Sequence, residues 1–229
     1  MTAADATVQV LMNATHGFDD RGLHYAVQYG GSYAREVLVD PAPAYPHDVQ
    51  LVTTEFDRVR ALAPLPFPMA VLLLSHEVVS RTNATYYNEY DYTSPPIETD
   101  GTTRYPPVGY IVLSAKRIPI HPAMTRYLVS HEYGHGVQYH LARLRGLDDQ
   151  KLLAEYREQC RPEASHGYGC GHWHTNVGEY FANDFRILVA EREVEFWPHP
   201  GNRPDENLSV IGYWARAIKQ LSSQAPRSA

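Results

Sequence analysis

The segment from Pro122 to Leu144 constrains this chain most, because it reads as one long helix and carries His131-Glu-Tyr-Gly-His135. Proline in the first turn and Gly146 just past the end are typical helix start and stop signals. Histidines four residues apart on a helix share one face, so both imidazoles can reach one metal ion. Glu132 lies one residue further round, beside that ion, where it can hold a water and accept its proton.

The abundance of His and Glu predicts about 0.04 accidental HExxH matches in a chain of this length, so the pattern indicates a functional site. A catalytic zinc site needs a third protein ligand and a position left open for water. The extended pattern HExxHxxGxxH does not supply it, because its glycine position is Gln138 and its third-histidine position is Leu141. His140 comes one residue too early and is expected off the ligand face, as a surface or supporting histidine.

Glu179 is the candidate for the third ligand. It lies early in a helix that is predicted to start at Thr175 or Asn176 and to run to about Glu193. Most neighbours on that helix are apolar and are expected to pack into a core: Tyr180, Phe181, Phe185, Leu188 and Val189. A carboxylate on such a helix, downstream of HExxH, suits a metal ligand better than a surface charge.

Residues 131–186 resemble the gluzincin metallopeptidases, through His131 to His135 followed by Asn176-x-x-Glu179-Tyr-Phe-Ala-x-x-Phe-Arg186. Within that group the pattern is most similar to the anthrax lethal-factor catalytic domain and the related secreted Pro-Pro endopeptidases. The resemblance implies that His131, His135 and Glu179 bind one zinc ion (Zn2+). It also implies that Glu132 is the general base.

The chain departs from that family at two positions. The family has an acid one turn after the third ligand, which orients a ligand histidine; here that position is Asn183, with Asp184 next to it. The family also has a tyrosine seven residues before the third ligand, which helps to hold the oxyanion. His172 stands there in this chain, so it is the first candidate for that role, with Tyr168 second and His174 as a further competitor.

The pattern of apolar residues predicts an α+β fold with the strands first and the helices last. Strands are predicted at Thr7–Met12, His24–Gln28, Glu36–Val39, Met69–Leu74 and Val108–Ser114, and further helices at Asp48–Leu62, Leu147–Gln159 and Glu206–Leu221. The polar, Tyr-rich stretch Arg81–Pro107 is expected to be a long loop. The resemblance implies one zincin-like domain over 1–229: a small mixed or antiparallel sheet packed on the HExxH helix, with a sheet-rich part at 1–120 and a helical part carrying the zinc site at 121–229.

Composition excludes several function classes. The 20 Lys and Arg residues are outnumbered by 26 Asp and Glu, and the acidic balance argues against a nucleic-acid partner. The longest apolar run, Met69–Leu74, is far too short to span a membrane. Met1–Val10 has no signal-peptide pattern, which leaves the cytoplasm and export both open; in an exported protein, Cys160 and Cys170 are expected to form a disulfide.

The expected function is that of a zinc-dependent endopeptidase, which hydrolyses peptide bonds through a metal-activated water with Glu132 as general base. Its partner is then a peptide or protein substrate, and the oligomeric state stays open. Two alternatives remain at this point. One is a zinc enzyme acting on a small molecule, for which the Tyr-rich loop around residues 86–92 leaves room. The other is an inactive zinc-binding interaction protein, against which the presence of Glu132 argues.

Overall fold

In the computed structural model, the described residues are 11–13, 46–67, 69–74, 84–90, 97–99, 102–104, 107–114, 122–165, 175–191 and 203–224. Contacts divide the chain into two compact units, each built from two stretches of sequence. We call Met1–Thr53 with Phe67–Leu128 the sheet unit, and Thr54–Pro66 with Val129–Ala229 the helical unit. The expectation of one domain over the whole chain stays a prediction.

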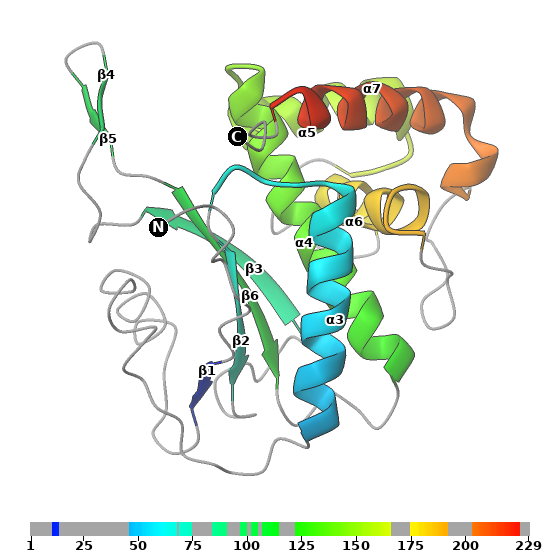
Figure 1. Ribbon diagram of the computed structural model, residues 1–229. Helices are drawn as coiled ribbons and strands as arrows, with labels where there is room; N and C mark the ends of the chain where they lie inside the picture. Colours follow the sequence, from blue (N-terminus) through cyan, green and yellow to red (C-terminus); the bar gives the residue numbers. More distant parts are fainter. Residues whose placement is uncertain are drawn as a thin grey trace. The chain divides into compact units, whose positions relative to one another are not determined.

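The sheet unit contains a four-stranded sheet in the order β1 (Leu11–Asn13), β2 (Met69–Leu74), β6 (Pro107–Ser114) and β3 (Ala84–Tyr90) (Figure 1). The pairs β1–β2 and β2–β6 are parallel, and β3 runs antiparallel to β6. A separate hairpin joins β4 (Ile97–Thr99) to β5 (Thr102–Arg104). The continuous apolar run of β2 fits its place between two parallel neighbours, and Val71 and its register partner Ile111 are fully buried.

Two strand predictions are confirmed and one loop prediction is wrong. Met69–Leu74 is a strand as predicted, and Val108–Ser114 is a strand that begins one residue earlier. The expected loop at Arg81–Pro107 instead contributes β3, β4 and β5; β3 includes Tyr86 and Tyr87. The backbone of β3 pairs with that of β6, which lies about twenty residues later in the chain. Such pairing between distant segments overrides the local preference of polar residues for a loop. The strands predicted at His24–Gln28 and Glu36–Val39 lie outside the described residues.

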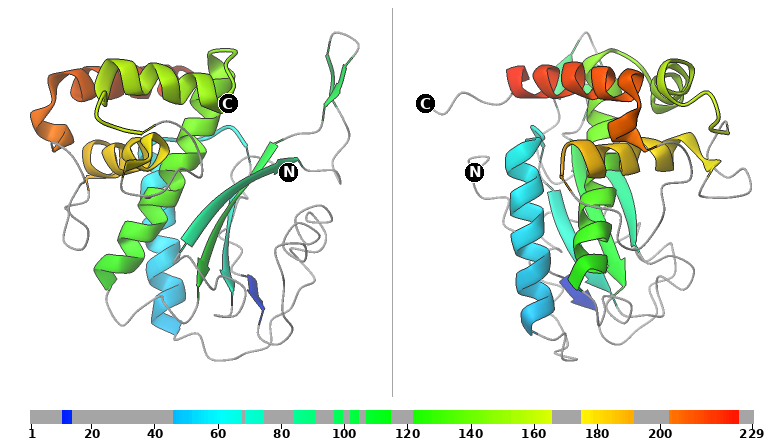
Figure 2. Two further views of the ribbon diagram at one scale, coloured as in Figure 1. Left: turned by 180° about the vertical axis from the view of Figure 1, so that it is seen from behind. Right: turned by 90° about the vertical axis from the view of Figure 1, so that its right-hand side faces the viewer.

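The helical unit contains the C-terminal parts of α3 (Pro46–Leu62) and α4 (Pro122–Leu144), followed by α5 (Asp149–Cys160), α6 (Val177–Leu188), the 3-10 turn η3 (Pro204–Glu206) and α7 (Leu208–Gln224). Helices α5, α6 and α7 contact one another pairwise (Figure 2). Buried aromatic rings fill the space between them, with Phe181 at 4.9 Å from Tyr156 and 4.8 Å from Trp214 between ring centroids.

The predicted α+β, zincin-like fold is contradicted. The unit that carries His131, Glu132, His135 and Glu179 is helical, and no strand occurs among its described residues. Its core is formed between helices, whereas the prediction placed a sheet against the HExxH helix. The error has a physical reason: periodicity shows which residues are buried in an element, but not which element buries them.

The ends of the helices around the motif follow local signals. Helix α4 has the predicted bounds, and Gly146 beyond it has a φ of 66°, the left-handed conformation that a C-terminal glycine adopts readily. Asn176 caps α6, because its side chain accepts from the backbone N of Gly178 at 2.8 Å. Helix α6 ends at Leu188, five residues before the predicted end. Among the described residues, no helix has both the length and the apolar character needed to cross a membrane.

The spacing of apolar residues in the last helix predicts one buried face, and this prediction is partly wrong. The predicted face consists of Leu208, Ile211, Trp214, Ile218 and Leu221. Leu208 is 85% exposed and Ile211 is 37% exposed. The buried face of α7 is instead rotated by one to two positions and consists of Val210, Tyr213, Trp214, Ala217 and Leu221. Trp214 and Leu221 are buried as predicted, and the rings of Tyr213 and Trp214 contact Tyr156 of α5 and Phe181 of α6.

Candidate metal centre

Helices α4 and α6 bring together the three residues expected to bind a metal. One potential ligand atom each from His131, His135 and Glu179 lies within 4.8 Å of the other two. Glu179 is placed between the imidazoles: its Oε2 is 3.1 Å from Nε2 of His131, and its Oε1 is 3.8 Å from Nε2 of His135. This group could hold a metal ion.

The far side of each imidazole is held by an amide oxygen. Nδ1 of His131 lies 3.3 Å from Oδ1 of Asn183, and Nδ1 of His135 lies 3.4 Å from Oε1 of Gln138. Amide oxygens only accept hydrogen bonds, so these contacts favour a hydrogen on Nδ1 of each ring and leave Nε2 as the ligand atom of a neutral ring. Nε2 of both rings then faces the carboxylate of Glu179, an arrangement that could hold a metal ion.

The protonation of the three groups follows from their burial and their contacts. Burial lowers the pKa of His135 to about 4, which keeps that ring neutral at pH 7. Burial also opposes the charged forms of the other two groups, but their mutual hydrogen bond and the charge attractions around them together outweigh it: the pKa of His131 is raised and that of Glu179 falls to about 2. The raised pKa of His131 favours its protonated form beside the ionised carboxylate of Glu179.

Gly134, inside the motif, sets how closely α6 crosses α4 (Figure 2). A Cβ built at Gly134 would lie 3.0 Å from Cα of Ala182, 3.1 Å from its carbonyl oxygen and 3.1 Å from Cδ1 of Phe185. The first two are backbone atoms of α6 and cannot turn aside. Glu179 lies one turn before Ala182, so the close crossing places its carboxylate at the histidines.

We expect Gly134→Ala to destabilise the protein and weaken metal binding. The helix gains about 1 kcal/mol in propensity, but forcing α6 away costs about 1–3 kcal/mol, so the packing term wins. Gly212→Ala on α7 is the matched control, because its Cβ meets only Arg216 Nη1 at an ordinary 3.5 Å. Urea unfolding should show the control unchanged or more stable; equal gains in both variants would contradict the close crossing.

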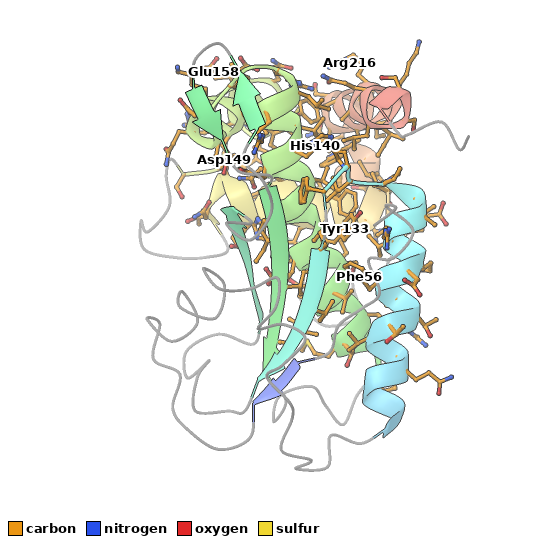
Figure 3. All side chains as sticks on the ribbon, turned by 60° about the vertical axis from the view of Figure 1, so that its left-hand side comes forward. Phe56, Tyr133, His140, Asp149, Glu158 and Arg216 are labelled. Atoms are coloured by element: carbon orange, nitrogen blue, oxygen red, sulfur yellow. The ribbon has the colours of Figure 1, made fainter. Side chains whose placement is uncertain are left out.

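The remaining motif residues are also buried. Glu132 is 6% exposed, and its negative charge helps to raise the pKa of His131. Tyr133 packs on the other side against Phe56 of α3, with ring centroids 5.8 Å apart, and its hydroxyl donates to the carbonyl of Ala63 at 2.7 Å (Figure 3). His140 is not in the ligand group but is buried, so of the two expected roles the surface one is wrong and the supporting one stays a prediction; burial lowers the pKa of His140 to about 4.

Asn183 and Asp184 have different partners. Asn183 accepts from His131, in the position where the resembled family has an acid. Asp184 is fully buried and instead binds Arg161, whose Nε and Nη2 donate at 2.8 and 2.5 Å, and accepts from the hydroxyl of Tyr156. Asp184 therefore ties α6 to the end of α5 and leaves the orientation of His131 to the amide.

The oxyanion candidates lie outside the described residues: His172, Tyr168 and the competitor His174. Their roles stay predictions. The described residues on either side of that segment are joined, because Ser165 donates from its backbone N to the carbonyl of Thr175 at 2.7 Å. Cys170 also lies outside the described residues, and Cys160 is a buried free thiol, so the disulfide is not formed in this structure.

Sequence reasoning missed two groups that the structure places at or beside the centre. Gln138 was noted only as a failed glycine position, although its spacing of three from His135 was a usable signal. The Arg161–Asp184–Tyr156 network had no local signal, since its members come from two helices and the loop between them. Comparison of the chain with models of protein families, with curated proteins and with solved structures finds no match.

Proposed function

We propose that the protein is a zinc-dependent peptidase that hydrolyses peptide bonds at the centre formed by His131, His135 and Glu179, with Glu132 as general base. The observation that carries the proposal is the convergence of two Nε2 atoms on one carboxylate, with both Nδ1 atoms engaged by amide oxygens. That set lies beside a buried carboxylate that is not itself one of the ligands.

Zinc is the metal that these donors favour. Two neutral imidazoles and one carboxylate are a common three-ligand set of catalytic zinc sites, which leave a position open for water or substrate. Sites for calcium or magnesium are built from oxygen ligands, so two nitrogen donors argue against both ions. Neutral His135 and ionised Glu179 are already in the protonation states that metal binding needs.

When bound, a zinc ion supplies Lewis acidity, which polarises a carbonyl and lowers the pKa of a water molecule. Glu132 accepts a proton from the attacking water while the water oxygen bonds to the scissile carbonyl carbon. Glu132 then delivers that proton to the leaving nitrogen as the C–N bond breaks. Its burial among the motif residues limits competing solvent at the carboxylate.

We expect the protein to cleave a peptide library only with metal present. A chelator should abolish cleavage, and added zinc should restore it. Glu179→Ala removes one of three ligands and is expected to lose zinc and activity together. Exposed Glu158 on α5 (Figure 3) provides the control, and Glu158→Ala should retain both. If Glu179→Ala kept its zinc content, or if a chelator did not affect cleavage, the proposal would be contradicted.

A further inference from the structure

We propose that Gln138 is a positioning residue of the metal centre, which holds the His135 imidazole in the tautomer and orientation that direct Nε2 at Glu179. The inference rests on the metal site of the proposed function and extends it, because Gln138 is neither a ligand nor the general base. The extended HExxHxxGxxH pattern, which this chain does not follow, has glycine at this position, whereas here it is a buried amide.

The geometry places the amide on one ring nitrogen. Gln138 follows His135 by three residues on α4, a spacing that puts the two side chains side by side. Its Oε1 lies 3.4 Å from Nδ1 of His135, and the residue is 1% exposed. Within the described part of the chain, Gln138 is the side chain that the structure places to accept from this nitrogen.

The same amide lies against the first turn of α6. A Cβ built at Gly178 would be 3.8 Å from Oε1 of Gln138, and Gly178 directly precedes Glu179. The side chain therefore lies beside the imidazole of one proposed ligand and near the turn that presents another. Its loss is expected to release the ring and to leave a gap beside that turn.

The neutral amide orients the ring without adding charge. A carboxylate in its place would accept the same hydrogen bond, make the imidazole more basic and add a negative charge near the metal. Gln138→Glu therefore keeps the proposed role, while Gln138→Leu keeps the approximate volume and removes the acceptor. Comparing the two variants separates the hydrogen bond from simple packing.

The tautomer of His135 is the direct test, read by two-bond 1H–15N NMR correlations of the full-length, metal-free protein at mildly alkaline pH. We expect hydrogen on Nδ1 in the wild type and in Gln138→Glu, and a shift toward the Nε2–H form in Gln138→Leu. Gln220 is the matched control. Its Oε1 accepts a hydrogen bond of 3.4 Å from Nε of Arg145, and neither residue belongs to the metal centre. Gln220→Leu should leave the His135 tautomer unchanged.

Zinc affinity, measured by competition with a chelator, is the second readout. We expect Gln138→Leu to bind zinc about 10- to 100-fold more weakly, and Gln138→Glu to bind at least as tightly as wild type. An Nε2–H tautomer in the wild type overturns the proposal even if Gln138→Leu does not fold. Unchanged tautomer and affinity in a folded Gln138→Leu would also overturn it. The tautomer is measured without metal or substrate, so failure of the peptidase proposal would leave this result distinguishable.

Discussion

Glu132→Gln is expected to reduce peptide hydrolysis by about 100- to 10,000-fold while the protein keeps its fold and its zinc, because the attacking water loses its base. Gln has nearly the same shape as Glu, and Glu132 lies outside the ligand group, so metal binding has no reason to fall. Steady-state kinetics should show the loss in kcat. Zinc content and circular dichroism of the same preparation establish that the centre and the fold are intact.

Glu55→Gln is a matched control for this experiment. Glu55 is also buried on a helix, at 2% exposed, but it pairs with Arg58 at 2.8 Å and is not in the ligand group. Its replacement should alter stability and leave kcat per folded molecule unchanged. Wild-type turnover in Glu132→Gln would remove Glu132 from the mechanism. Equal losses in both variants would point to a general effect of removing a buried charge.

Asp184→Ala is expected to have the largest effect on stability, lowering the free energy of unfolding by about 3–5 kcal/mol. Asp184 and Arg161 are both fully buried, and the carboxylate is paired at 2.5 and 2.8 Å. Removing it leaves the guanidinium charged in the core and takes away the acceptor of the Tyr156 hydroxyl. Small proteins are stable by about 5–15 kcal/mol, so urea unfolding should show the midpoint falling sharply.

The exposed pair Arg203–Asp205 is the control for Asp184. Its atoms lie 2.9 Å apart, but solvent screens them, so Asp205→Ala should cost less than about 1 kcal/mol. Combining Asp184→Leu with Arg161→Met should recover a large part of the loss, because neither charge of the buried pair then remains in the core. A cost for Asp184→Ala no larger than that for Asp205→Ala would show that the buried pair contributes little.

The sequence by itself determined the features that depend on local spacing. The bounds of α4 and the position of its terminal glycine were predicted, and the cap of α6 was narrowed to Thr175 or Asn176, because helix ends are set by neighbouring residues. The pairing of His131 with His135 followed from the same rule, since a helix fixes which residues share a face. The choice of Glu179 as their partner came from its position on a helix of buried apolar residues.

Tertiary structure alone decided what surrounds those features. A helical unit, with no strand in its described residues, carries the site where a sheet was expected, and a polar stretch near Tyr86 joined a sheet. Asn183 is the partner of His131, whereas Asp184 is the partner of Arg161. Which partner each side chain has depends on the segment that packs against its face of α6. Local periodicity cannot encode that choice, because burial says only that a side chain has partners. The partners themselves are fixed by contacts between segments far apart in the chain.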